Sequence, residues 1–302
     1  MSKLFLKQGI MNKVLYALIP ITIFSIFLFG WRVLFILAIT NIFAAITEYA
    51  FIRKRKNGRI SMAVFVTGSL LALILPPTVP FWIAAVGAVF GVAFGKMVFG
   101  GFGMNVFNPA IVGRTFVYIS FPKAMTITWL EPFQSLPGGF AVFQRSEMIT
   151  KATPMTILEN SNTNLPLTDL FWGFIPGSAG ETSAVLILLA GIYLILTKTA
   201  KWQPILSLLA SFIVFSFIFN GLNTIYLILS GGVLFGTVFM ITDPISMPKN
   251  KYSIWLYGII VGFLTVIIRK YSLFTEGFMF ALLIANVFMP IIDYSFNKLK
   301  IK

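Results

Sequence analysis

The sequence predicts an all-α polytopic membrane protein with about ten transmembrane helices, and three observations lead to that prediction. Of the 302 residues, 58% are hydrophobic and only 11% are charged, whereas soluble domains carry about 25% charged residues. The mean hydropathy is +0.92. Apolar runs of the length that crosses a bilayer, about 17–25 residues, follow one another along the chain. We therefore expect a single integral membrane domain over residues 1–302.

The candidate spans follow a short basic start without a signal-peptide cleavage pattern. In this start, Met1 to Lys7, Lys alternates with Leu and Phe, which suggests a helix on the inner membrane surface or a frayed tail. Two of the spans, the third and the fifth, are short and polar at one end. The spans lie at about 14–30, 32–51, 62–76, 80–98, 106–121, 183–197, 203–219, 223–241, 254–269 and 276–295.

The charge distribution predicts the orientation. The chain has 23 Lys and Arg against 9 acidic residues, a net charge of +14, and short cytoplasmic loops are enriched in basic residues. Placing both termini in the cytoplasm puts most Lys and Arg inside, including the run 53–59, Lys96 and the C-terminal lysines. Residues 122–180 then form a long extracytoplasmic loop, a candidate working part. Nucleic-acid binding is disfavoured, because the basic residues occupy short loops.

The chain contains no Cys and no His. Disulfides, zinc sites, His-held haem and Cys-held iron–sulfur clusters are therefore excluded within it. A His general base is also excluded. Any redox work would need an organic carrier that is held by oxygen and amide groups.

Residues 100–114 interrupt the apolar pattern with four glycines, two asparagines, a proline and an arginine. Hydrocarbon offers no partners for such groups, so this stretch is either a tight turn with polar caps or an interrupted helix at a binding site. A weak echo follows, in which Gly231-Gly232 leads to Thr242-Asp243-Pro244. A two-half repeat with interrupted helices would bring Asn105, Asn108 and Asp243 together.

Few acidic residues fall within or at the ends of the spans. Such acids can mark ion or substrate paths, or they can simply favour a helix N-terminus through its dipole. Glu181 and Glu276 each begin a span and fit the second interpretation. Asp243 follows a span and fits it less well. These three are the candidate ion-path residues.

Residues 100–114 resemble the signature of the RnfD/NqrB family, which contains the RnfD subunit of the Rnf complex and the NqrB subunit of the sodium-pumping NADH:quinone reductase. As it stands here, the motif is Gly-Gly-Phe-Gly-x-Asn-x-Phe-Asn-Pro-Ala-x-x-Gly-Arg. Segments 176–183, 242–246 and 276–277 agree with the family in the same order, and the resemblance covers residues 14–295. It implies a fold like that of ammonium and urea channels.

The resemblance also implies a function. The chain would be a membrane flavoprotein subunit of an ion-translocating electron-transport complex of the Rnf type, linked to ferredoxin and NAD. It would relay electrons between flavins in the cytoplasmic membrane of a bacterium or archaeon, coupled to Na⁺ or H⁺ transport, as a translocase subunit and not as a stand-alone enzyme. Chain length favours the RnfD branch. The alternatives are an NqrB-like component and a channel or transporter of small polar solutes without a redox role.

In this family a threonine in the pattern Asp-x-x-Ser/Thr-Gly-Ala-Thr carries FMN through a phosphoester that a flavin transferase attaches. The matching residues are 147–153, so Thr153 would be the acceptor, with Glu147 in place of Asp and Lys151 in place of Gly. Arg114 is a candidate partner for phosphate or flavin oxygens.

The quinone-reductase branch also holds a noncovalent riboflavin on the inner side. The matching residues are Asn105, Asn108 and Asp243. Asn amides suit the imide and ribityl groups, because each amide offers donors and an acceptor. The implied partners are further membrane subunits and flavin and iron–sulfur subunits, which would bind NAD and ferredoxin, since no dinucleotide-binding motif is present here.

Overall fold

The computed structural model describes residues 5–53, 55, 58–144, 166–220, 224–272 and 276–299. This described part is dominated by helices. Its strands are two short ones, β1 (Phe5–Leu6) and β2 (Ile60–Ser61), which pair in parallel. The all-α class predicted from the sequence is confirmed.

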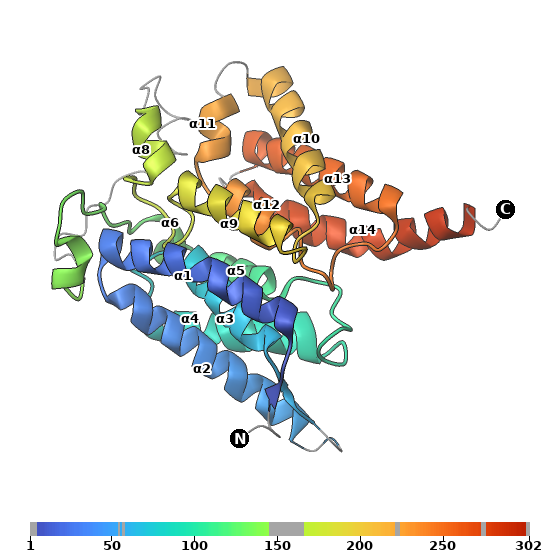
Figure 1. Cartoon of the computed structure of the whole chain (residues 1–302), viewed down its shortest axis with the longest axis horizontal. Coiled ribbons are helices and arrows are strands. Elements are labelled where there is room, and N and C mark those ends of the chain that lie inside the picture. The colour runs from blue at the N-terminus through green and yellow to red at the C-terminus, as the bar shows by residue number, and fades with distance from the viewer. Residues whose placement is uncertain are drawn as a thin grey trace.

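The N-terminal group of helices (blue to teal in Figure 1) packs around the short helix α3. α2 lies against α3 and α4, and α4 lies against α5. α4 continues into one stretch of π-helix, Ala93–Met97. The bounds are α1 Gly9–Phe29, α2 Arg32–Ile52, α3 Ala63–Ile74, α4 Phe81–Val92 and α5 Pro109–Ser120.

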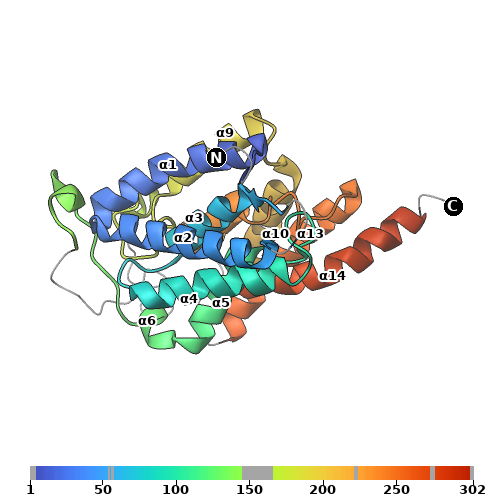
Figure 2. The ribbon, with the colours of Figure 1, turned by 90° about the horizontal axis from the view of Figure 1, so that it is seen from below.

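The C-terminal group is built around α13, which packs against α10 and α14. In two perpendicular views α14 extends beyond the other helices toward the C-terminus (Figures 1 and 2). The two groups meet where α1 contacts α9 and α5 contacts α14. The bounds are α9 Ala184–Leu196, α10 Trp202–Asn220, α11 Thr224–Leu229, α12 Val233–Phe239, α13 Lys251–Tyr271 and α14 Gly277–Leu299.

Short elements lie between the two groups in sequence. They are α6 (Pro122–Thr126), a 3₁₀ turn (Gly138–Ala141) and α8 (Leu167–Trp172). They belong to the predicted outer loop 122–180, of which the structure describes 122–144 and 166–180. Glu147 and Thr153 lie outside the described residues.

Among the described residues, five helices are long and apolar enough to cross a membrane. They are α1, α2, α10, α13 and α14. Every one of the ten predicted spans contains helix, but several contain only a short one. A multi-pass membrane protein is thus supported, whereas ten complete spans and the two-half repeat stay predictions.

The short helix α3 has an evident local cause for its C-terminal end. α3 stops at Ile74, and Leu75 is extended with φ −90° and ψ 150°. Pro76 follows, and a residue before proline disfavours the helical region. α3 and α12 are buried on almost all sides, which is the position expected of a helix that is apolar all round.

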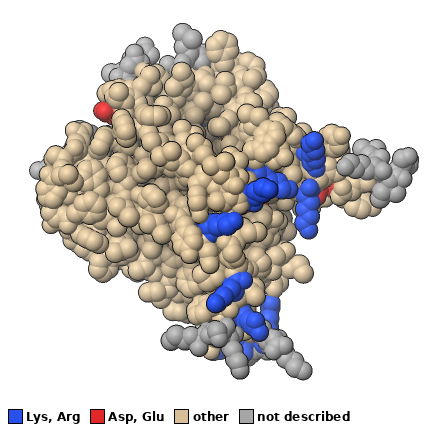
Figure 3. Space-filling model, viewed as in Figure 1, with Lys and Arg blue, Asp and Glu red and all other residues tan. Residues whose placement is uncertain are grey.

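Basic side chains gather toward one end of the molecule. Figure 3 shows Lys and Arg concentrated on the lower right side of the face in view, away from α6 and α8. At the basic end Lys13 donates to the carbonyl of Thr197 at 3.1 Å and Arg55 to that of Gly100 at 2.6 Å. The predicted orientation would place this basic end in the cytoplasm, and the orientation stays a prediction.

Candidate functional site

The glycine-rich stretch forms the connection between α4 and α5. Gly100, Gly101 and Gly103 have φ of 119°, 105° and 89°, a region that L-residues with side chains rarely adopt. The chain reverses here and enters α5 at Pro109, whose fixed φ suits the first helical turn. The glycines therefore let the chain turn back between α4 and α5, with Phe102 and Met104 exposed and Asn105 and Asn108 buried.

Asn108 caps α5. Its Oδ1 accepts from the backbone nitrogens of Ala110 at 3.0 Å and Ile111 at 3.4 Å, two of the donors that a helix N-terminus leaves without partners. In the same loop Asn105 donates from Nδ2 to the carbonyl of Phe107 at 3.0 Å. The polar-cap interpretation is therefore correct for Asn108, and it leaves the amide nitrogen of this residue for another partner.

A second turn follows α12. Asp243 accepts from the Ile245 nitrogen at 3.3 Å and from the Ser246 hydroxyl at 2.8 Å. An aspartate that bonds to the backbone two residues on stabilises a turn. Asp243 therefore has a local structural role at the end of this interrupted span.

The two turns line one pocket. Asn105, Asn108 and Asp243 contribute to its wall together with apolar side chains from α1, α3 and α12. The cavity volume is about 60 Å³, and the empty space around it, including the part that opens to the surroundings, amounts to about 660 Å³. The structure brings the three residues to one site, as the sequence echo anticipated, while their role as ligand contacts stays a prediction.

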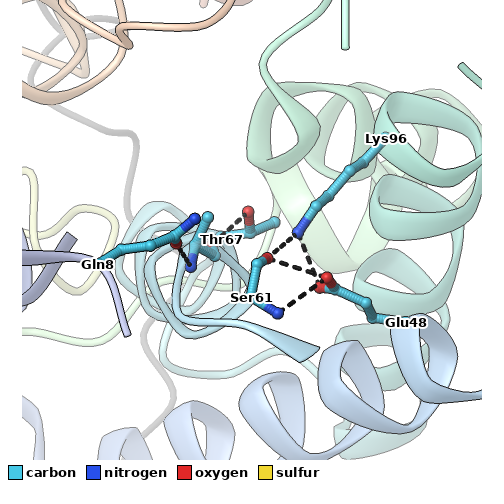
Figure 4. Close-up of polar contacts among 6 residues, drawn as sticks. Gln8, Glu48, Ser61, Thr67 and Lys96 are labelled. Atoms are coloured by element: carbon cyan, nitrogen blue, oxygen red, sulfur yellow. Dashed lines mark hydrogen bonds and ion pairs between the residues drawn. The ribbon is translucent and has the colours of Figure 1, made fainter. Parts of the chain in front are cut away.

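Lys96 lies in the wall of the same pocket and was not singled out by the sequence. Only 2% of it is exposed. Its ammonium donates to Glu48 Oε2 at 2.7 Å and to Ser61 Oγ at 2.6 Å (Figure 4). Its position in the sequence could have revealed it, because Lys96 falls inside the predicted span 80–98 and charged residues within membrane spans are rare and functional.

A second buried charge cluster joins the two helix groups. Arg114 Nη1 lies 2.5 Å from Glu181 Oε1, and Nη2 lies 3.2 Å from Oε2 and 3.3 Å from Ser178 Oγ. Arg114 also forms an ion pair with Glu276. Arg269 lines the same small cavity. The charges of Arg114 and Arg269 thus balance those of Glu181 and Glu276 around this cavity.

Gly232 lies directly beside this cluster. A side-chain carbon at this position would collide with the carboxylate of Glu181. The neighbouring Gly231 has φ 74°. The Glu181 carboxylate thus approaches the backbone closely at Gly232.

The contacts within this cluster bear on the helix-capping and ion-path interpretations of Glu181 and Glu276. Ser183, not Glu181, caps α9, with Oγ accepting from the Leu186 nitrogen at 3.5 Å. Glu181 and Glu276 both face Arg114, so a cation on a path through them would meet two arginines. Both arms of Arg114 are engaged by these partners. Its contact with a cofactor on residue 153 stays a prediction.

The architecture and these two polar sites define a polytopic α-helical membrane protein with a pocket between its two helix groups. More particularly, the chain belongs to the NQR2, RnfD, RnfE family, whose model matches residues 6–302. The family resemblance inferred from the motifs is confirmed.

Three relatives are each the B subunit of a Na⁺-translocating NADH-quinone reductase. The NqrB subunit of the Na⁺-translocating NADH-quinone reductase of Ectopseudomonas mendocina is 36% identical over 282 residues, 88% of this chain and 67% of that protein. The NqrB subunits of Yersinia pestis and Pseudomonas paraeruginosa are each 34% identical, covering 88% and 84% of this chain and 67% and 64% of those proteins. The chain spans about two thirds of the length of these relatives. The preference for the RnfD branch, which relied on chain length, receives no specific support.

Proposed function

We propose that this chain is an electron-relaying flavoprotein subunit of a multi-subunit, ion-translocating oxidoreductase, comparable to the NqrB subunit of the Na⁺-translocating NADH-quinone reductase. The observation that carries the proposal is the 36% identity to such a subunit over 88% of this chain. The same similarity favours the quinone-reductase type over the Rnf type. In both types the chain would be one subunit of a translocase.

The pocket is the proposed site of a noncovalent flavin such as riboflavin. Asn105 uses one N–H within its own loop and Asn108 uses its oxygen as a cap. The oxygen of Asn105 and the amide nitrogen of Asn108 are then the groups that can meet a ligand. The imide edge of a flavin offers both an N–H donor and carbonyl acceptors, so the donor set fits.

The remaining pocket wall suits a ring system. Apolar side chains such as Met11, Val66 and Phe239 line it beside a few polar groups. Binding sites for cofactors combine such walls with a small number of orienting polar groups. A flavin held there would supply one- and two-electron chemistry, which no side chain of this Cys- and His-free chain offers.

Thr153 is the proposed attachment point of a covalent FMN. The support is the match of residues 147–153 to the family pattern, and a phosphoester to a hydroxyl needs neither Cys nor His. A tethered flavin keeps a high effective concentration at its site. A flavin transferase would be the maturation partner, and the segment would face outward, with both termini in the cytoplasm.

Further subunits would supply and remove the electrons. Iron–sulfur ligation by Cys is impossible here because the chain has no Cys, and no dinucleotide-binding motif is present. Nicotinamide and ferredoxin would therefore be bound by partner subunits. The lipid membrane and these subunits are the proposed surroundings of the exposed apolar helices.

In-gel fluorescence of the denatured chain tests the covalent flavin. We expect a fluorescent band for the wild type and for Thr150→Val, and none for Thr153→Val. Thr150→Val is the matched control, because it removes a hydroxyl from the same segment. A band that persists in Thr153→Val would contradict the attachment site. A wild type without fluorescence would favour a channel or transporter.

A further inference from the structure

The flavin pocket proposed above contains a buried cation, Lys96. It lies in the π-helical stretch Ala93–Met97 that ends α4, and such stretches often mark functional sites. Burial of an ion pair costs desolvation and is weak evidence for stability. A lysine that is 2% exposed and lines a pocket therefore requires a further explanation.

Two neighbouring side chains hold the Lys96 ammonium group in place. Glu48 Oε2 and Ser61 Oγ accept two of its hydrogens, at 2.7 and 2.6 Å. Glu48 Oε1 is itself held by the Ser61 nitrogen at 3.1 Å and the Ser61 hydroxyl at 2.9 Å. Figure 4 shows Lys96 reaching across to Ser61 and Glu48, which come from separate segments.

An ammonium group has three N–H donors. The two acceptors named above use two of them, which leaves one for an acceptor in the pocket that Lys96 lines. The same pocket wall carries one further charged group, Asp243, which is bonded to Ile245 and Ser246 in its own turn. The Phe102 ring lies 5.9 Å from the Lys96 nitrogen and adds no acceptor oxygen.

We propose that Lys96 donates its third N–H to a carbonyl oxygen or ring nitrogen of the noncovalent flavin, and that the Glu48–Lys96 pair sets the reduction potential of that flavin. This inference rests on the proposed function of the pocket. On reduction the neutral ring takes two electrons and one proton and becomes a monoanion. The electrons come from the preceding flavin or another reduced carrier of the complex, and the proton comes from water.

The sign of the effect follows from electrostatics. The Lys96 charge stabilises the reduced anion, and the Glu48 charge opposes it, more strongly in a medium of low dielectric constant than in water. Removing the carboxylate charge therefore raises the reduction potential. Removing the ammonium as well lowers it again. A pair that only fastens the helices together would give no such opposite shifts.

The test is a spectroelectrochemical titration of the releasable flavin in the purified membrane complex. Glu48→Gln keeps an acceptor for Lys96. At a fixed applied potential it should raise the ratio of reduced to oxidised flavin at least tenfold, which corresponds to a rise of about 30 mV in the reduction potential of a two-electron couple. The double variant Glu48→Gln/Lys96→Met should shift it back by at least as much. Asp293→Asn, an acid-to-amide change outside the pocket lining, should leave the potential unchanged.

The outcomes separate the two claims. A wild type that carries no releasable flavin overturns the proposed pocket function, and this inference with it. A bound flavin whose potential is the same in the wild type and in Glu48→Gln overturns the inference alone. Glu48→Gln decides even where the double variant fails to accumulate, because it leaves Lys96 and its bond to Ser61 in place.

Discussion

Arg114 on α5 and Glu181 ahead of α9 are 67 residues apart in the sequence and are joined by two hydrogen bonds, from Nη1 to Oε1 at 2.5 Å and from Nη2 to Oε2 at 3.2 Å. They connect the N-terminal and C-terminal helix groups at a buried position. Glu276 binds the same guanidinium from the start of α14. The core of the membrane domain is thus fastened by charges that compensate one another.

Arg114→Gln should therefore destabilise the protein strongly. Two carboxylates would lose their partner, and breaking a buried pair costs about 3–5 kcal/mol. We expect a lower midpoint of thermal aggregation in detergent and a lower yield. Lys123→Gln, at an exposed position on α6, serves as the control and should behave as the wild type. An Arg114→Gln protein as stable as the wild type would contradict the fastening role.

Gly232→Ala should also destabilise the protein, by less than Arg114→Gln. The new methyl group would overlap the Glu181 carboxylate and displace it from Arg114. Gly9→Ala is the matched control, because nothing lies within 4 Å of the carbon it would add. Thermal stability in detergent should fall for the first variant only. Equal midpoints for the two variants would show that Glu181 can move without cost.

Asn108 variants should separate capping from ligand binding. Asn108→Ala removes the cap of α5 and should cost about 1 kcal/mol, together with the releasable flavin. Asn108→Ser keeps an oxygen for the cap but lacks the amide nitrogen. It should retain most of the stability and still lose releasable flavin, as measured in the supernatant after denaturation. Full flavin content in Asn108→Ser would exclude the amide contact.

The orientation can be tested directly because the chain has no Cys. Single cysteines at two exposed positions, Ser135→Cys in the predicted outer loop and Lys249→Cys at the basic end, report the two sides. A membrane-impermeant maleimide should label Ser135→Cys in intact cells. Lys249→Cys should react only after lysis. The reverse pattern would place the termini outside.

Much of the helical framework could be predicted from the sequence, because apolar run length alone locates membrane helices. The meeting of Asn105 and Asp243 in one pocket was also accessible, through the repeated glycine pair. The Glu48–Lys96 pair was not, because its members are 48 residues apart in the sequence. Which charges pair depends on how the helices pack, and no local pattern encodes that.

The central claim is that this membrane subunit carries flavins, and their inventory on the purified complex is its most direct test. Intact mass of the denatured chain should rise by one FMN less water, with the modification on the peptide that contains Thr153. The supernatant should contain one further flavin per chain. A chain of unmodified mass with no flavin in the supernatant would contradict the account.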